Sequence, residues 1–377
     1  MDEFAGPAEN AAARFAAADA QSLSSFVRGE FRHARETAET FLWEAEAEGR
    51  GMEAGAARRM LGLVCLFQGD LKAARSVLER ALADYLPERD GKTQFLFGRD
   101  TEVAAAAYLA LAEWHLGEVE RARHLIDRAT RRADELRQAA TIANALFFKT
   151  CLECRRDDVT ATRLAADALL VVTKEYGIEA YAHAGQIFAN WAHGRLLDPE
   201  AGATELRQAL TANAAQGNRV ATPLGHGLLA ELEATTRGPD AALTLIDRGL
   251  TISQEMGRLF TDPYLNRLRG EILLKRDPAN PAPAEEAFQT AIAIAEEQGA
   301  RSYVLLASLS LAKLTNPWPA RTKPMRSSRP RLRASRPRPR CRRSTRRRRC
   351  LSVWGRAAKE LSLRKMERQK ADGGWAR

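Results

Sequence analysis

The sequence predicts an all-α fold in which helical hairpins recur about every forty residues and stack into a solenoid. Short segments of one pattern, a turn followed by an amphipathic helix, occur repeatedly along the 377 residues. Within each segment the apolar residues are three and four positions apart, which places them on one face of a helix. Alternating apolar and polar residues, the pattern of half-buried strands, are absent from the sequence.

Six segments align as copies of this pattern. They begin at Gly69, Gly117, Arg156, Leu197, Gly238 and Pro278, and a seventh, looser copy begins at Gly29. Their penultimate small residues are Ala81, Ala129, Ala168, Ala209, Gly249 and Ala291, at spacings of 48, 39, 41, 40 and 42. A single hairpin cannot bury its own apolar face, so the copies are predicted to stack on one another.

Each copy is predicted to be the second helix of a hairpin. Gly-Asp and Gly-Glu pairs suit the turn before it, because glycine ends one helix and an acid favours the start of the next. The buried faces are predicted to include Leu78 and Leu245. The first helices are expected at 52–68, 101–116, 137–154, 179–196, 218–236, 262–275 and 300–314.

The one long spacing of 48 indicates an insertion between residues 86 and 100. We expect Phe95, Leu96 and Phe97 to pack this loop against the solenoid, and Asp100 to be the N-cap of the helix that follows. Asp90 to Thr93 imitate the end of a phosphate-binding loop, but Leu86 stands where that motif needs a glycine and no strand precedes it. A loop that contacts a ligand remains an alternative.

The fold class is therefore a tetratricopeptide-like α-solenoid of about seven helical hairpins with a disordered basic C-terminal tail. Three segments are expected: a lead-in over residues 1–20, the solenoid over 21–314, and an Arg- and Pro-rich tail over 315–377.

Charge divides the chain at Leu314. The tail holds 22 Lys and Arg against 3 Asp and Glu, a net charge of +19, whereas residues 1–314 hold 36 against 45, a net charge of −9. Nucleic-acid binding is therefore expected of the tail alone, as weak and non-specific binding to phosphates. The helix at 302–314 also lacks the second helix of its hairpin, and the tail has the composition that a GC-rich gene gives in a shifted frame. We expect such a shift after about Leu314.

The sequence favours a cytoplasmic protein that does not enter a membrane. Five scattered cysteines do not form a disulfide framework, the first ten residues lack the apolar region of a secretion signal, and no apolar run is long enough to span a bilayer. The sequence does not specify an oligomeric state.

No pattern of catalytic or metal-binding residues stands out. Cys151 and Cys154 form a C-x-x-C within a helix without further ligands at zinc spacing, so core packing is the favoured interpretation. His115 continues an apolar helical face and is expected to be a core or rim residue. We therefore expect no catalytic residue, no metal and no cofactor.

The first helices of hairpin solenoids usually line the concave surface, which makes their polar and aromatic residues candidates for contact with a protein or peptide partner. These candidates are Trp114, Asn144, Asn190, Trp191, His226, Asn266 and Arg267.

Three stretches carry a resemblance to a known family. They are "ARSVLERALADYLPERDGKTQFLFGRDTEVAAAAYLALAEWHLGEVERA", "YLNRLRGEILL" and "AEEAFQTAIAIAEEQGARSYVLLASLSLAKL". They resemble the C-terminal repeat region of bacterial signalling proteins that begin with a class III adenylate/guanylate cyclase domain followed by an AAA-type ATPase, over about residues 21–314. The resemblance implies a regulatory, protein-binding solenoid without an active site.

The favoured function is thus a non-enzymatic repeat scaffold, a regulatory module or remnant of such a signalling protein. One alternative is a component of a cyclase or ATPase whose catalytic domains are missing from this chain. Others are the sensor part of a transcription regulator and a nucleic-acid binder that acts through its tail.

The charge division makes a testable prediction. Deleting residues 315–377 should abolish any binding of nucleic acid, because the remaining chain carries a net charge of −9. Binding of the full chain to duplexes of unrelated sequence should be equal and should fall steeply between 50 and 200 mM salt, as about one counterion is released per phosphate contact. Fluorescence anisotropy measures both, and sequence-selective binding at physiological salt would contradict the prediction.

Overall fold

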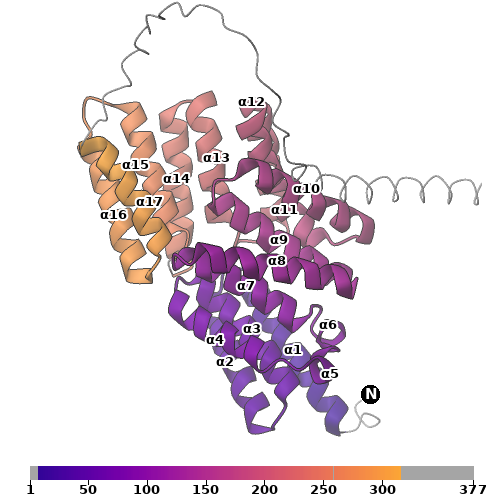
Figure 1. Cartoon of the computed structure of the whole chain (residues 1–377). Coiled ribbons are helices and arrows are strands. Elements are labelled where there is room, and N and C mark those ends of the chain that lie inside the picture. The colour runs from indigo at the N-terminus through magenta and orange to yellow at the C-terminus, as the bar shows by residue number, and fades with distance from the viewer. Residues whose placement is uncertain (1–6, 258, 316–377) are drawn as a thin grey trace, which may run out of the picture. The chain divides into compact units, whose positions relative to one another are not determined.

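The computed structural model describes residues 7–257 and 259–315 (Figure 1). Every regular element in these ranges is a helix: α1 (Pro7–Val27), α2 (Phe31–Ala47), α3 (Gly51–Phe67), α4 (Leu71–Ala83), α5 (Pro87–Asp90), α6 (Thr93–Leu96), α7 (Thr101–His115), α8 (Val119–Leu136), α9 (Ala139–Arg155), α10 (Val159–Tyr176), α11 (Glu179–Leu196), α12 (Pro199–Ala215), α13 (Thr222–Thr236), α14 (Pro239–Glu255), α15 (Asp262–Arg276), α16 (Ala282–Gln298) and α17 (Arg301–Thr315).

The long helices pair in chain order into seven hairpins, α1/α2, α3/α4, α7/α8, α9/α10, α11/α12, α13/α14 and α15/α16, with α17 after the last. This arrangement confirms the predicted all-α solenoid and its number of hairpins. Helix α1 runs through the predicted boundary after residue 20 and stacks Phe15 on Phe41 of α2, with ring centroids 5.3 Å apart. The predicted tail lies outside the described residues from position 316 onward. None of the described helices is both long and apolar enough to cross a membrane.

The two helices of a hairpin are buried to different extents. In α7, Glu102 is the one residue of 15 that is not buried. In α8, burial is confined to a stripe of Ala122, Ile126, Ala129 and Ala133. The first helices therefore form an inner layer packed on several sides, and the second helices cover it with one apolar face each.

The repeat is more regular in the structure than in the sequence alignment. Ala168, the aligned small residue of the α10 copy, is exposed, and Leu169 occupies the buried position instead. The buried positions from Ala129 to Gly249 are then forty residues apart at every step. A leucine fits here because Gly185 of α11 lies opposite, where an added Cβ would be 3.1 Å from the Leu169 side chain.

The insertion folds into the two short helices α5 and α6. Asp100 caps α7 as predicted, since its side chain accepts a hydrogen bond of 2.9 Å from the backbone N–H of Val103. The prediction that three apolar side chains pack this loop was wrong for two of them. Phe97 is buried near Phe41, but Phe95 is 76% exposed and Leu96 is also exposed. A four-residue helix turns its side chains in different directions, so one of the three reaches the core.

Hydrogen bonds connect three early hairpin turns with later parts of the chain. The carbonyl of Val27 accepts hydrogen bonds from the backbone N–H groups of Arg219 and Val220, at 2.9 and 3.2 Å. The carbonyl of Phe67 accepts one from Phe260 N–H at 3.1 Å. Ser302 Oγ, in the first turn of α17, donates to the carbonyl of Trp114 near the end of α7. Each of α1, α3 and α7 thus has a carbonyl near its carboxyl end that accepts a hydrogen bond from a later part of the chain.

Aromatic side chains fill the space beside these joints. Phe67 packs on Phe260 with centroids 4.7 Å apart, and Trp114 packs edge-on against Tyr303 at 5.3 Å. His115 is fully buried among Trp114, Phe260 and Tyr303, which is the core position expected of it. Neither of its ring nitrogens has a hydrogen-bond partner in the described part of the chain.

The buried face of α4 can be tested with one substitution. Leu78 is fully buried against Gly62, whose added Cβ would be 2.4 Å from Leu78. Leu78→Asp should lower the free energy of unfolding by about 3–5 kcal/mol, because it buries an unpaired charge. Urea unfolding followed by far-UV circular dichroism measures the loss.

The matched control is Leu164→Asp on α10, since Leu164 is 67% exposed and should change stability by less than about 0.5 kcal/mol. The other predicted face was displaced by one residue: Leu245 is half-buried and Ile246 is fully buried. Equal losses at Leu78 and Leu164 would contradict the assignment of faces.

His115 makes stability depend on pH. Burial, and next the positive charge of Arg155, hold the pKa of His115 well below its usual value. The unfolded chain takes up a proton below about pH 6.5 whereas the folded chain does not, so stability falls as the pH decreases, by up to about 1.4 kcal/mol per pH unit.

His115→Leu should remove this contribution. The difference in unfolding free energy between variant and wild type should change in favour of the variant from pH 7 to pH 5, as measured by urea unfolding at each pH. His33 is exposed, so His33→Leu serves as the control. A difference that does not change with pH at position 115 would show that His115 is protonated in the folded chain.

Candidate functional site

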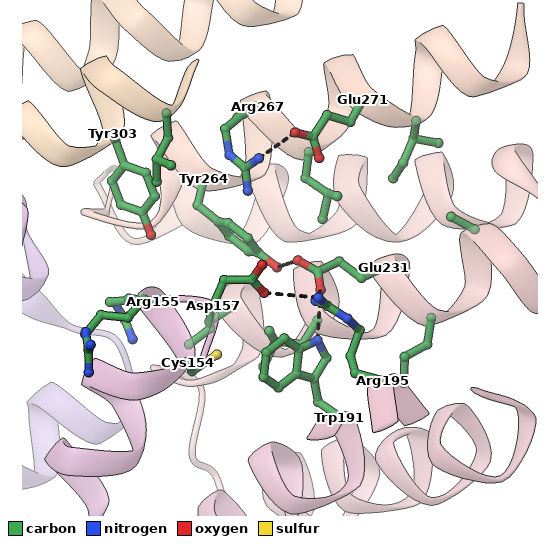
Figure 2. Close-up of a pocket in the computed structure, with 18 of the residues that line it drawn as sticks. Cys154, Arg155, Asp157, Trp191, Arg195, Glu231, Tyr264, Arg267, Glu271 and Tyr303 are labelled. Atoms are coloured by element: carbon green, nitrogen blue, oxygen red, sulfur yellow. Dashed lines mark hydrogen bonds and ion pairs between the residues drawn. The ribbon is translucent and has the colours of Figure 1, made fainter. Parts of the chain in front are cut away.

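The inner layer encloses a groove of about 870 Å³. The first helices of successive hairpins line it, from the carboxyl ends of α7 and α9 through α11, α13 and α15 to α17. Trp114, Leu228 and Leu268 line it with apolar side chains. Charged residues, among them Asp157, Arg195 and Glu231, line it as well (Figure 2). The size falls within the range of about 300–1,000 Å³ that is usual for ligand pockets.

Glu231 is the centre of the polar network in this groove (Figure 2). Its carboxylate accepts hydrogen bonds from Trp191 Nε1 at 2.9 Å, Arg195 Nη1 at 3.0 Å and Tyr264 Oη at 2.8 Å. Arg195 also pairs with Asp157 at 3.1 Å. Burial, and next the charge of Glu231, hold the pKa of Tyr264 well above its usual value, so Tyr264 remains a hydrogen-bond donor.

The network joins three helices at one position of the repeat. Trp191 of α11, Glu231 of α13 and Glu271 of α15 are successively forty residues apart. Glu271 accepts hydrogen bonds from Arg267 Nη1 at 2.5 Å and from Ser310 Oγ of α17 at 3.1 Å. Polar side chains at this repeat position therefore point into the groove from neighbouring helices.

The structure brings three of the seven predicted partner residues, Trp114, Trp191 and Arg267, to this groove. Asn266 lines a different cavity of about 470 Å³ between α14, α15 and α16. His226 is buried, with Nδ1 at 3.0 Å from the Thr222 carbonyl. Asn190 is half-buried on α11 and its carbonyl faces Gly202 of α12.

Asn144 lies in a smaller cavity of about 90 Å³ within the aromatic core. Its Nδ2 donates to the hydroxyls of Tyr108 at 3.2 Å and Tyr181 at 2.9 Å. Phe67 and Phe260 also line this cavity, so the joints between early turns and later loops close it. At this volume it is smaller than a cavity of about 150 Å³ that accommodates benzene.

The cysteine pair and the phosphate-loop-like segment noted in the sequence are packed into the fold. Cys151 and Cys154 are both buried in α9, where burial raises the pKa of Cys151 to about 11 and raises the pKa of Cys154 well above its usual value. Thr93 Oγ1 is buried and accepts a hydrogen bond from the Thr101 N–H, and a helix rather than a strand precedes this loop. No group of His, Cys, Asp and Glu in the described residues has a metal-binding arrangement.

Sequence reasoning missed Glu231, Tyr264, Arg195, Arg155 and Tyr303, all of which line the groove. The repeat register could have found Glu231, because it lies forty residues after Trp191. Arg155 and Tyr303 had no such signal, since α17, which carries Tyr303, is distant in sequence from α7 and α9 and packs on Trp114 of α7 only in the folded chain.

The sequence matches no protein-family model, and it matches no curated protein. A solved structure similar to this chain is the crystal structure of a tetratricopeptide repeat protein from Parabacteroides merdae ATCC 43184. The two share 17% sequence identity over 80% of this chain and 99% of that chain, with a TM-score of 0.42.

Proposed function

We propose that this chain is a non-enzymatic repeat scaffold that binds a protein or peptide partner in the groove between α7 and α17. The observation that carries the proposal is the groove itself, in which Trp191, Glu231 and Glu271 recur at the forty-residue period on adjacent helices. An extended peptide repeats its side chains at a regular spacing as well, so parallel helices that present one repeat position offer it a series of equivalent contacts.

The groove supplies both kinds of contact that a peptide needs. Leu228 and Leu268 are buried in its wall, and Leu305, which is 61% exposed, offers the apolar surface that side chains of a partner would cover. Trp191 donates a hydrogen bond to Glu231, and the Arg195 guanidinium lies over the Trp191 ring, 5.2 Å from its centroid. Side chains that are already fixed lose little entropy on binding, which favours affinity.

We further propose that the scaffold is a regulatory module of a cyclase/ATPase signalling protein. The support is the resemblance of the segments around Ala73, Tyr264 and Ala284 to the repeat region of such proteins. On this proposal the module contributes binding, and catalysis resides in domains that the resembled proteins carry elsewhere. Co-expression with a class III cyclase domain, followed by co-purification, tests this association.

Selection from a random peptide library displayed on phage tests the binding function. Thr235 is exposed in the groove and donates to the Leu232 carbonyl, and Thr251 is exposed on α14 outside the groove and donates to the Asp247 carbonyl. Selected peptides should lose about tenfold or more in affinity for Thr235→Trp, because a bulky ring occupies the groove, and should bind Thr251→Trp like the wild type.

Isothermal titration calorimetry on the selected peptides measures these affinities. Peptides that bind both tryptophan variants equally would place the binding surface elsewhere on the solenoid. A library that yields no binding peptide would contradict the scaffold function.

A further inference from the structure

The end of the groove nearest α7 contains a buried arginine without a counter-ion. Arg155 is 9% exposed, yet in the described part of the chain no carboxylate lies within ion-pairing distance of its guanidinium. Its Nη1 donates to the Cys151 carbonyl at 3.1 Å, and its Nε is buried without a hydrogen-bond partner in the described residues. Its Cζ lies 4.7 Å from the ring centroid of Phe260, and the Cys151 side chain is also a neighbour of the guanidinium.

This arrangement is costly in the free protein. Arginine stays protonated at any pH that a folded protein experiences, so the charge cannot be avoided by loss of a proton. Buried charges in proteins are normally paired, because an uncompensated one loses its hydration without replacement. Arg155 lines both the groove and the smaller aromatic cavity, so an anionic group that enters the groove would supply the counter-charge that the free protein lacks.

Two further groups lie beside Arg155. Tyr303, 3% exposed, lines the same groove, and Figure 2 shows it with Arg155 at the end of the site away from Glu271. Burial raises the pKa of Tyr303 to about 12, and the charges of Arg155 and Arg267 act on the same hydroxyl. Tyr303 therefore keeps its proton as a hydrogen-bond donor, and it lines the same groove as Arg155 and Arg267.

The charge of the whole groove has the same sign. The residues that line it include six cations, Arg155, Arg156, Arg195, Arg267, Lys275 and Lys313, and three acids, Asp157, Glu231 and Glu271. The acids are already engaged, since Asp157 and Glu231 pair with Arg195, and Glu271 pairs with Arg267. The groove lining thus carries a net positive charge, although residues 1–314 as a whole carry a net charge of −9.

We propose that Arg155, Tyr303 and Arg267 form an anchor site for a carboxylate of an acidic peptide that lies in the groove. The inference rests on the proposed scaffold function and specifies the chemistry of its partner. A peptide is favoured over a free anion because the groove of about 870 Å³ is much larger than one anionic group and continues along Leu228 and Leu268. The peptide's apolar side chains contact those leucines while its carboxylate is bound at Arg155.

The test uses three acetylated, amidated ten-residue peptides that alternate leucine with glutamate, glutamine or lysine, together with inorganic phosphate and acetate as free anions. Calorimetry on the full chain at 150 mM salt should show that the glutamate peptide binds at least about tenfold more tightly than the other two. Neither free anion should bind at millimolar concentration or shift the melting temperature.

Variants separate the anchor from the fold. Arg155→Gln should weaken the glutamate peptide about tenfold or more and leave the glutamine peptide unchanged. Its melting temperature should equal or exceed that of the wild type, because the unpaired charge is gone. Arg155→Lys should restore part of the affinity. Arg163→Gln is the control and should have no effect, because Arg163 lies on α10 outside the groove and its side chain is 38% exposed.

Each other outcome contradicts a specific statement. Equal binding of the glutamate and glutamine peptides would overturn the anchor and leave the scaffold function intact. Binding of phosphate or acetate without the peptides would assign the site to a free anion. A lower melting temperature of Arg155→Gln with unchanged peptide affinity would make Arg155 a structural residue, and failure of every peptide would count against the scaffold function itself.

Discussion

Hydrogen bonds connect three early hairpin turns with later parts of the chain. They determine which part of the inner face is covered by other chain segments and which part stays open as the groove. A helix leaves its last carbonyl groups without partners inside the helix, and these groups need other donors when they are buried. At Val27, Phe67 and Trp114 the donors come from residues near 220, 260 and 302. The rings of Phe67 and Phe260 pack at these joints and close the aromatic core around His115.

One repeat position consequently has two environments. Tyr108, Phe148 and Phe188 lie forty residues apart and line the small cavity within the aromatic core. The same position in α13 and α15 is Leu228 and Leu268, which line the groove. The repeat sets the direction of these side chains, and the joints decide whether other chain segments cover them. The polar network of Glu231 is possible where they do not.

Close approach of the helices depends on glycine opposite a large side chain. An added Cβ would be 2.6 Å from Leu232 at Gly194 and 2.5 Å from Phe288 at Gly270. These glycines belong to first helices, and the large residues come from the next first helix or from the second helix of the same hairpin. The pair of Gly194 and Leu232 brings α11 and α13 together, and Trp191 of α11 donates to Glu231 of α13 beside it.

The sequence by itself determined the helices, their pairing and the forty-residue period, because these depend on residues close together in the chain. The cap at Asp100 and the burial of Leu78 could be read from local pattern for the same reason. The burial of Leu169 in place of Ala168 could not be read from the sequence, since it depends on Gly185 in the next helix.

Only the tertiary structure decided where the groove lies and which side chains meet in it. The anchor residues Arg155 and Tyr303 are separated by 148 positions, and they are neighbours because the first turn of α17 packs against the end of α7. A periodic pattern specifies the face on which a residue lies, but contact between distant repeats depends on the accumulated geometry of every hairpin between them.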